Sequence, residues 1–363
     1  MKILWFSHRD IKNPRSGGAE RTIYEVGKRI SLKGNIFIWI SASWNNKYSE
    51  EIMDNIIIKR EKNNSLLHLK VPEIIKREKP DFIVDDMGHA VPFLSENFTK
   101  IPGIVFFHHL HRRSLKGQVN FPMRMILSGL EAFYPVFYRK WHFITESNSS
   151  INDLINLGIQ NKRIIKIPPG VNTELFRPLK KTEFPSIVYF GGFRDYKRPW
   201  EVIYAVNNLI KKCNNIMLYM IGSGPSLNKT MKIYNDLDIK NNVIFLGRIN
   251  NNDLSNIVGS SWLNVHTSIT EGFGFSILEA SSAGTPTIAY DVPGVRDVII
   301  QNKNGFTVKD GSIDDLTKKI DNFISNYDNR WINSSRSIAL EYSWDKTAEL
   351  WLTNIKKTLE IYK

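Results

Sequence analysis

The stretch Ile167-Pro168-Pro169-Gly170-Val171-Asn172 decides the fold class, because it lies between two series of alternating strand-like and helix-like segments. Short apolar runs rich in β-branched and aromatic residues recur before it, and the same rhythm restarts after it. Pro and Gly interrupt regular structure, and Arg177-Pro178 adds a second interruption nearby. We therefore predict a linker here and an α/β protein of two αβα domains, each built on a parallel sheet.

The apolar runs give the expected strands and, with them, the places to search for function. Before the linker the runs are residues 3–6, 37–40, 82–84, 104–107, 143–145 and 164–167, and after it they are residues 187–190, 217–221, 243–246, 263–265 and 287–290. In open parallel sheets, ligands bind outside the carboxyl ends of the strands. The residues that directly follow these runs are therefore the candidates for a site.

The composition favours a soluble globular protein. A chain of 363 residues suits two domains, and 42% hydrophobic with 23% charged residues argues against extended disorder. Cys213 is the single cysteine, so neither an internal disulfide nor a cysteine-based zinc site is expected. No apolar run is long enough to cross a bilayer and no signal-peptide pattern is visible, which predicts a cytoplasmic protein.

The net charge of +13 is concentrated in the first half of the chain. Such an excess attracts acidic lipid surfaces, nucleic acids and phosphorylated substrates alike, so the charge alone does not choose among them. Segment 112–141 combines basic residues with interleaved Phe, Met, Ile and Leu around a single acid, Glu131. It is compatible with an anionic membrane surface, on the inner face of the cell membrane, or with an ordinary amphipathic helix packed on its own sheet. Its basic residues are Arg112, Arg113, Lys116, Arg124, Arg139 and Lys140.

Two features of the first half follow expected strands. Gly17 and Gly18 lie at a strand-to-helix turn, where glycines let backbone amides approach an anion, although a plain tight turn explains them equally well. Phe107-His108-His109-Leu110-His111 ends another run. Neighbouring residues of a strand point to opposite faces and no carboxylate lies nearby in the sequence, which argues against zinc. We predict that His108, or else His109, uses a neutral ring to bind a hydroxyl or stabilise positive charge.

The second half opens with a strand, a glycine pair and three cations. Backbone amides after Gly191-Gly192, together with Arg194 and Lys197, are suited to neutralising a diphosphate, while a solvated basic turn is the plain alternative. Gly222-Ser223-Gly224 lacks the third glycine and the helix of a dinucleotide fingerprint, so a nicotinamide enzyme is poorly supported.

The most specific stretch is residues 270–280, in which Glu271 and Glu279 flank a glycine-containing loop and a helix start. Amides at that helix N-terminus can receive phosphate oxygens, and each carboxylate can accept hydrogen bonds from sugar or ribose hydroxyls. Paired acids also occur in glycoside hydrolases, but the glycine loop and the cations would then lack a purpose. Simple helix capping is the remaining alternative.

These residues resemble the retaining glycosyltransferases of family 4, which have the GT-B fold of two facing Rossmann-like domains with a cleft between them. The resemblance covers nearly the whole chain, and the Glu-x7-Glu segment followed by Gly284-Thr285-Pro286 is its most specific part. It implies an acceptor domain at residues 1–170, a nucleotide-sugar domain at 171–343, and a helix at 344–363 that packs back on the first domain.

The resemblance also implies roles for individual residues. Glu279 would hold the nucleotide ribose, Lys197 the leaving diphosphate, and His108 would lie beside the donor sugar. Gly18, with Gly17, would approach the diphosphate. The transferred sugar and phosphates would be held by Glu271 and the backbone of Gly272, Phe273, Gly274, Phe275 and Ser276, and the nucleobase would pack on Arg248 and Ile249.

One position departs from the family pattern. Family members usually have Gly-Arg where this chain has Gly191-Gly192, so a diphosphate cation is missing at position 192. Arg194 is expected to supply that charge from a shifted position. The resemblance further implies retention of configuration, no cofactor besides the nucleotide-diphosphate sugar, and no essential metal. Asp85-Asp86 is the nearest metal candidate, and a structural role is preferred for it.

The sequence therefore predicts a hexosyltransferase that acts on a hydroxyl acceptor, either lipid-linked or part of a growing glycan. A nucleotide-sugar epimerase of the same architecture and a catalytically weak nucleotide-sugar-binding protein remain as alternatives. Nucleic-acid binding fits the charge but leaves the paired acids and the glycine loops unexplained, so no nucleic acid is expected as a partner.

Overall fold

The computed structural model describes residues 1–45, 47–62, 64–115, 118–212, 215–237 and 239–362. The chain divides into two compact units. The first consists of Met1–Arg112, Phe121–Gly170 and Ser343–Lys363, and the second of Arg113–Asn120 and Val171–Tyr342. The change from one unit to the other at Gly170 and Val171 falls within the Pro-Pro-Gly stretch.

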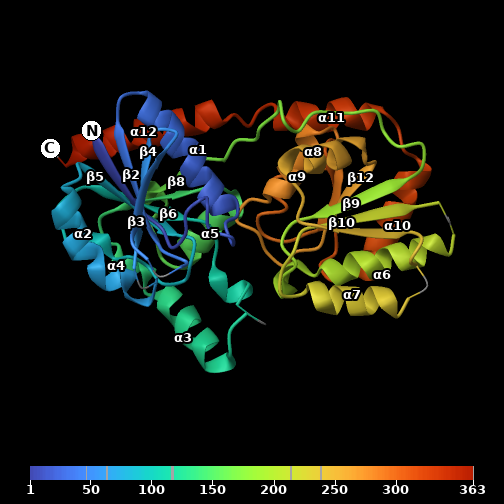
Figure 1. Cartoon of the computed structure of the whole chain (residues 1–363), viewed down its shortest axis with the longest axis horizontal. Helices are drawn as coiled ribbons and strands as arrows, with labels where there is room; N and C mark the ends of the chain where they lie inside the picture. Colours follow the sequence, from blue (N-terminus) through green and yellow to red (C-terminus); the bar gives the residue numbers. More distant parts are fainter. Residues whose placement is uncertain (46, 63, 116–117, 213–214, 238, 363) are drawn as a thin grey trace. The chain divides into compact units, whose positions relative to one another are not determined.

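The first unit is built on an eight-stranded sheet with the order β3-β4-β2-β1-β5-β6-β7-β8. Its strands are drawn in blue to green and its C-terminal helix in red (Figure 1). Its strands are β1 (Lys2–Phe6), β2 (Ile36–Ala42), β3 (Ser49–Met53), β4 (Ile56–Glu61), β5 (Phe82–Met87), β6 (Gly103–Phe107), β7 (His142–Thr145) and β8 (Ile164–Lys166). Its helices are α1 (Gly18–Leu32), α2 (Val71–Glu78), α3 (Phe121–Ala132), α4 (Tyr134–Phe137), α5 (Asn148–Asn156) and α12 (Trp344–Ile361), with short 3-10 turns η1 (Asn64–Lys70), η2 (Ser95–Asn97), η3 (His111–Arg113) and η4 (Asn161–Arg163).

Both faces of this sheet are covered by helices. Successive side chains of a strand point to opposite faces, so Trp5 of β1 packs in the core formed with α1 and α12, whereas Phe6 packs in the core formed with α2 and α5. Central strands that are buried on both faces read as continuous apolar runs, which is why they could be found in the sequence.

The C-terminal helix α12 completes the core of the first unit. The ring of Trp351 is fully buried, with its centroid 4.7 Å from that of Trp5 and 5.1 Å from that of Phe106. The chain leaves this unit at Gly170 and returns at Ser343. A Cβ atom on Gly170 would lie 2.3 Å from the backbone nitrogen of Trp344, so only glycine fits where the two segments meet.

The second unit is built on a six-stranded parallel sheet with the order β11-β10-β9-β12-β13-β14. Its strands are β9 (Ser186–Phe190), β10 (Met217–Ile221), β11 (Val243–Gly247), β12 (Leu263–His266), β13 (Thr287–Tyr290) and β14 (Gly305–Val308). Its helices are α6 (Pro199–Ile210), α7 (Leu227–Asn235), α8 (Asn251–Ser260), α9 (Phe275–Ser282), α10 (Ile313–Ser325) and α11 (Arg330–Ala339), with η5 (Asp195–Lys197) after β9. Val206 of α6 and Ile320 of α10 share one core, and Val258 of α8 lies in the other.

Each predicted apolar run coincides with a strand, but β3, β4 and β14 were not predicted. The expectation of purely parallel sheets is wrong at one edge, because β3 pairs antiparallel with β4. A tight turn joins the two strands, and both of its residues, Asp54 (φ 48°) and Asn55 (φ 63°), have left-handed backbone conformations. The edge strand β3 is amphipathic and only partly buried, so its signal in the sequence is weak.

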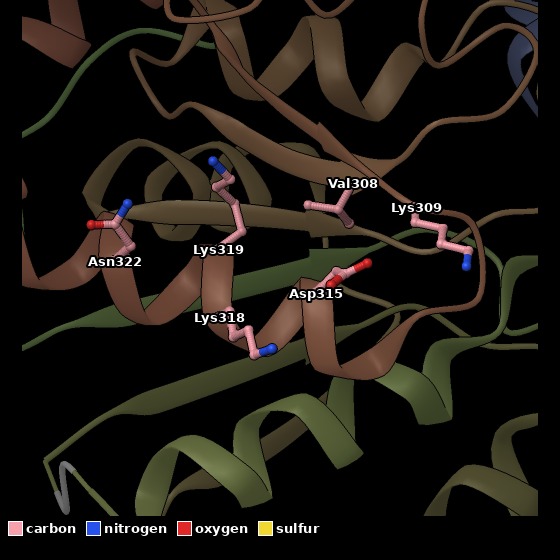
Figure 2. A pocket seen from close by; sticks show the side chains of 6 residues that line it. All are labelled: Val308, Lys309, Asp315, Lys318, Lys319 and Asn322. Atoms are coloured by element: carbon pink, nitrogen blue, oxygen red, sulfur yellow. The ribbon is translucent and has the colours of Figure 1, made fainter.

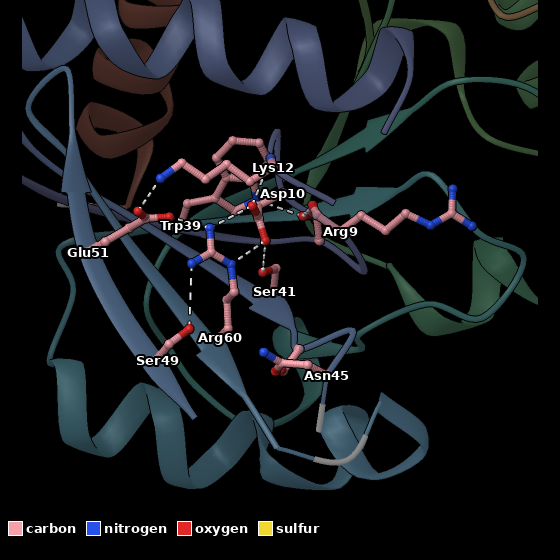
Figure 3. Close-up of polar contacts among 11 residues, drawn as sticks. Arg9, Asp10, Lys12, Trp39, Ser41, Asn45, Ser49, Glu51 and Arg60 are labelled. Atoms are coloured by element: carbon pink, nitrogen blue, oxygen red, sulfur yellow. Dashed lines mark hydrogen bonds and ion pairs between the residues drawn. The ribbon is translucent and has the colours of Figure 1, made fainter. Parts of the chain in front are cut away.

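A buried ion pair fixes the loop that follows β1. Arg60 of β4 donates from Nε and Nη2 to the two carboxylate oxygens of Asp10, each at 2.8 Å, and Ser41 Oγ donates to Asp10 Oδ2 at 2.9 Å (Figure 3). Glu51 of β3 accepts from both Arg60 and Lys12. Asp10 is fully buried, so its charge depends on these partners. The network therefore holds the segment that leads into the Gly17 turn.

Candidate active site

The clearest charged contact of the second unit joins the two residues predicted to act on the donor. Lys197 Nζ donates to Glu271 Oε1 at 2.8 Å. The same oxygen accepts from His266 Nε2 at 3.1 Å and from Ser268 Oγ at 2.6 Å. Lys197 follows β9 and His266 ends β12, so neighbouring strands of the sheet bring them together.

Backbone contacts hold both partners of this pair in place. The carbonyl of Tyr196 accepts from Ile269 N at 2.8 Å, and the carbonyl of Lys197 accepts from Thr267 Oγ1 at 2.8 Å. Glu271 N donates to the carbonyl of Pro293 at 3.0 Å. The η5 turn and the loop after β12 therefore form one hydrogen-bonded layer under the ion pair.

The protonation states of the pair follow from their mutual attraction. Burial alone would raise the pKa of Glu271, but the Lys197 ammonium and then His266 outweigh it, and the pKa lies far below its ordinary value. Burial would likewise lower the pKa of Lys197, but the Glu271 carboxylate outweighs it, and the pKa is raised. Both groups are therefore charged at neutral pH.

The predicted helix start after Glu271 is α9, which begins at Phe275. Gly274 is its N-cap and has a φ of 92°, a conformation that favours glycine. Ser276 Oγ lies 3.3 Å from His266 Nδ1, which links the first turn of α9 to the ion pair. Glu279 lies one turn further along and is almost fully buried. The N-terminus of α9 carries the partial positive charge of the helix dipole beside the ion pair.

Arg194 occupies the space beside Gly192. A Cβ atom built on Gly192 would lie 3.6 Å from Arg194 Nε and 3.7 Å from its Cγ, and both atoms belong to a flexible side chain. The Arg194 side chain therefore runs along the position from which an arginine at 192 would project. Arg248 and Ile249 directly follow β11, where Arg248 is exposed and Ile249 packs against the core that contains Val258.

In the first unit, His108 lies between two carboxylates, contrary to the expectation that no carboxylate is nearby. Its Nε2 is 2.6 Å from Asp86 Oδ1, and its Nδ1 is 3.5 Å from Glu146 Oε2. The assignment of a neutral ring is therefore wrong. Burial would lower the pKa of His108, but Asp86 and then Glu146 outweigh it and raise the pKa to about 10.

Asp85 and Asp86 have different surroundings, although they were considered together. Asp85 is fully buried and accepts from Ser95 N at 2.9 Å and from Tyr138 OH at 2.8 Å, as expected of a structural residue. Asp86 instead faces His108 and also accepts from Gly88 N at 3.1 Å. Asp86 is therefore a residue of the candidate site.

The Gly17 turn connects to the same charged group. Gly17 is the N-cap of α1, and its backbone nitrogen donates to Glu20 Oε2 at 2.7 Å, as in a capping box. Thr22, one turn into α1, donates from Oγ1 to Glu146 Oε1 at 3.0 Å. Glu146 therefore ties the first turns of α1 to His108.

The search of the sequence missed Asp86, Glu146, His266 and Ser268 as site residues. Glu146 directly follows β7, and His266 is the last residue of β12. Both stand at the carboxyl ends of strands, so the rule that singled out His108 could have found them. Asp85 and Asp86 are consecutive residues of one strand, so their side chains point to opposite faces of the sheet. The sequence does not show which of these faces carries the site, and so it could not distinguish Asp86 from Asp85.

No group of His, Cys, Asp and Glu suited to a metal ion occurs among the residues that the structure describes. Cys213 and Lys116 lie outside those residues. A pocket in the second unit is lined by Val308, Lys309, Asp315, Lys318, Lys319 and Asn322 (Figure 2). It contains none of the predicted site residues, and Lys309 and Lys318 are exposed to solvent, so we assign no role to it. Over the described ranges, none of the helices has the length and apolar character needed to cross a membrane.

The raised pKa of His108 gives a testable stability profile. Its imidazolium form is favoured in the folded state, so its contribution is fully present below an unfolded pKa of about 6.5 and is lost as the pH rises through the folded value. The free-energy difference of unfolding between the wild type and His108→Gln should therefore fall as the pH is raised from neutral toward about 10. Urea unfolding at several pH values measures it, and His142→Gln, at the start of β7, is the control. Titration of the His108 ring near its ordinary value would contradict the assignment.

Two protein families match successive parts of this chain. Residues 16–175 match the family described as Glycosyltransferase Family 4, and residues 171–338 match the family described as Glycosyl transferases group 1. An uncharacterized glycosyltransferase from Haemophilus influenzae is 24% identical over 356 residues, covering 93% of this chain and 95% of that protein. An uncharacterized glycosyltransferase from Methanocaldococcus jannaschii is 28% identical over 181 residues, a match that spans only 49% of this chain and 45% of that relative.

Solved structures agree on the fold. A glycosyltransferase from Rickettsia africae has a TM-score of 0.78 at 20% identity and covers 99% of this chain and 98% of its own. The Anabaena protein HepE, solved in complex with UDP and glucose, has a TM-score of 0.76 at 16% identity and covers 98% of this chain and 99% of its own. Since the two family matches run from residue 16 to residue 338 and the fold is that of these structures, the chain belongs to the family 4 glycosyltransferases with the GT-B fold.

Proposed function

We propose that this protein transfers a hexose from a nucleotide-diphosphate sugar to a hydroxyl acceptor with retention of configuration and without an essential metal. The observation that carries the proposal is the partly buried Lys197–Glu271 contact beside the N-terminus of α9. The solved complex of HepE with UDP and glucose supports a nucleotide as the leaving group. The expected cleft between the two domains stays a prediction.

The donor is proposed to bind the second unit in two parts. Its diphosphate is met by Lys197, Arg194 and the amides at the start of α9, because a helix N-terminus and fixed cations both stabilise phosphate oxygens. Its sugar hydroxyls donate to Glu271, whose pKa far below the ordinary value keeps it an acceptor. Glu279 is proposed to hold the ribose, and Arg248 and Ile249 are proposed to pack on the base.

The chemical step follows from this arrangement. The bond between the anomeric carbon and the phosphate oxygen breaks, and its electron pair stays on the diphosphate. Lys197 and Arg194 stabilise that added charge. The acceptor hydroxyl forms the new bond on the same face and gives its proton to the departing phosphate oxygen. His108 is proposed to act as a fixed imidazolium beside the sugar, because two carboxylates already face its nitrogens.

We further propose that α3 and the turn after it contact an anionic membrane, at the cytoplasmic face, and bring the protein to a lipid-linked acceptor. Among the described residues, Glu131 is the only buried residue of α3, so the helix is not the ordinary amphipathic helix with its apolar side chains packed on a sheet. Phe121 and Ile126 are 67% and 64% exposed, and Met125 is 56% exposed. Exposed apolar side chains next to basic residues are typical of membrane-surface helices.

The basic residues of this segment do not all face solvent. Arg112 Nε donates to Glu131 Oε2 at 2.8 Å, and Glu131 is fully buried. Arg124 lies over the ring of Phe121, with 5.5 Å to its centroid, and Arg139 and Lys140 are exposed. The proposed membrane surface therefore consists of the exposed apolar side chains of α3, with Arg124 on the same helix and with Arg139 and Lys140, which follow α4, as further exposed cations.

Replacing Lys197 by Ala should lower kcat for transfer by about 10²- to 10³-fold, because a fixed charge on the leaving group is lost. Glu271→Gln, which keeps Lys197, should weaken use of the donor sugar while binding of the free nucleotide diphosphate is retained. A panel of nucleotide-diphosphate sugars, with product analysis, measures both effects. Epimerised donor formed without an acceptor would instead indicate an epimerase.

Lys212→Ala is the control for Lys197→Ala, since Lys212 is a largely exposed lysine of the same unit that pairs with Asp321. Its activity should equal that of the wild type. The wild-type assay repeated with EDTA tests metal independence, and transfer abolished by the chelator would overturn that part of the proposal. Melting temperatures of all variants identify those that lose activity by unfolding.

Arg194 is tested by loss and rescue. Arg194→Ala should reduce transfer, and the double variant Gly192→Arg with Arg194→Ala should restore it, because the new side chain enters the space that Arg194 has left. Kinetic measurement of kcat and KM compares the three proteins. Full activity of Arg194→Ala would refute the hypothesis that Arg194 replaces the arginine expected at position 192. Nucleotide binding without any transfer by the wild type would instead favour a pure binding protein.

Membrane contact is tested by co-sedimentation with anionic and zwitterionic vesicles at low salt. The variant Met125→Glu with Ile126→Glu should bind anionic vesicles about tenfold less, because two apolar side chains no longer leave water. Ile52→Glu on β3 is the control, since Ile52 is 72% exposed but lies outside the segment. Equal binding by all three proteins, or none by the wild type, would remove the membrane proposal.

A further inference from the structure

Four basic groups gather at the carboxyl edge of the first sheet, apart from the His108 group. His8 and Arg9 follow β1, His89 follows β5, and His68 lies in η1 after β4. The His8 ring centroid is 4.2 Å from that of His89 and 4.9 Å from that of His68. All four side chains keep some exposed surface. We call these residues the histidine cluster.

The hydrogen bonds of the cluster leave ring nitrogens without partners. Arg9 Nη2 lies 3.0 Å from His89 Nε2, and since a guanidinium only donates, His89 Nε2 must accept. The proton of the neutral His89 ring is therefore on Nδ1, which is shielded from water and has no acceptor. His8 Nε2 bonds His68 Nε2 at 2.9 Å, and His8 Nδ1 is likewise shielded and without a partner. Buried polar atoms without partners commonly mark a place for a missing ligand or water.

The charged neighbours that lower the pKa of the His8 and His89 rings are basic. Burial first, and then His68, Arg9 and His111, hold the pKa of His8 well below its ordinary value. Burial and the same neighbours, with His8, do so for His89. Acids also lie in this region, where Glu20 interacts with Arg9, and Glu131 and Asp86 act on His111. The low pKa values of His8 and His89 come from burial and from the neighbouring basic groups.

We propose that Arg9, His8 and His89 bind an oxyanion, a phosphate or carboxylate group, of the acceptor. That the group belongs to the acceptor rests on the proposed function. An oxyanion supplies an acceptor for the Nδ1 proton of His89, favours uptake of a solvent proton at Nδ1 of His8, and accepts hydrogen bonds from the Arg9 guanidinium. A metal cation is disfavoured because the Arg9 guanidinium contacts a ring nitrogen that would have to bind it. Since an anion favours the protonated rings, it binds more tightly as the pH falls.

Histidine ring NMR of the whole chain tests the site. The Cε1–Hε1 resonances are assigned with His8→Gln and His89→Gln and titrated with pH in NaCl, and again with inorganic phosphate, methyl phosphate or acetate at equal ionic strength. At least one oxyanion should raise the pKa of the His8 and His89 rings by about half a unit or more, which corresponds to about threefold tighter binding to the protonated form. If only the phosphates raise these pKa values, the site binds phosphate groups. If acetate raises them as well, the site also binds carboxylates.

The control ring is His142. It is the first residue of β7 and therefore lies at the amino end of that strand, whereas the histidine cluster lies at the carboxyl ends of the strands. If His8 and His89 shift no more than His142 in every anion, the inference is overturned. Arg9→Gln should abolish the response. Lys197→Ala should keep the anion-dependent pKa shift while it loses transfer. An error in the donor assignment would therefore leave this shift unchanged, whereas an error in the oxyanion site would remove it.

Discussion

Parallel strands all end at the same edge of a sheet, and this constraint gathers the charged residues of both units. Each crossover helix returns the chain to the opposite end, so every loop after a strand opens at one edge. In the first unit those loops carry His108 and Glu146, and in the second they carry Lys197 and Glu271. The packing of the loops buries the first two side chains and partly buries the other two, so each charge is stabilised by a partner. Ion pairs between distant parts of the sequence are the result.

The strands could be predicted wherever both faces of the sheet are covered. A strand covered by helices on both faces is apolar throughout, and β1, β6 and β9 stand out in the sequence for that reason. The β3 edge strand is partly polar because solvent covers one of its sides, and its antiparallel pairing depends on the turn at Asp54. Such strands carry a weak signal. The same reasoning explains α12, whose apolar stripe predicts a helix but does not by itself identify the sheet that Trp351 reaches.

The candidate site was predictable in its residue types and much less so in its contacts. Lys197 and Glu271 were identified separately, one as a diphosphate cation and the other as a sugar ligand, yet they form a direct ion pair. Their separation of 74 residues gives no periodicity from which the contact could be inferred. For His108, a neutral ring was predicted, but its raised pKa favours the charged form. A neutral ring is expected of a buried histidine. Asp86 on β5 and Glu146 directly after β7, the two strands that flank β6, reverse the effect of burial.

The ion pair also limits how a donor can bind. A diphosphate beside Lys197 brings negative charge toward Glu271, which stays ionised because its pKa is far below the ordinary value. The two like charges repel unless something separates them, and sugar hydroxyls serve that purpose because they donate to the carboxylate. In the proposed complex, Lys197 turns toward the phosphates while Ser268 and His266 still donate to Glu271. The arrangement therefore favours a ligand with an anionic part and a hydroxyl-rich part joined together over a free sugar.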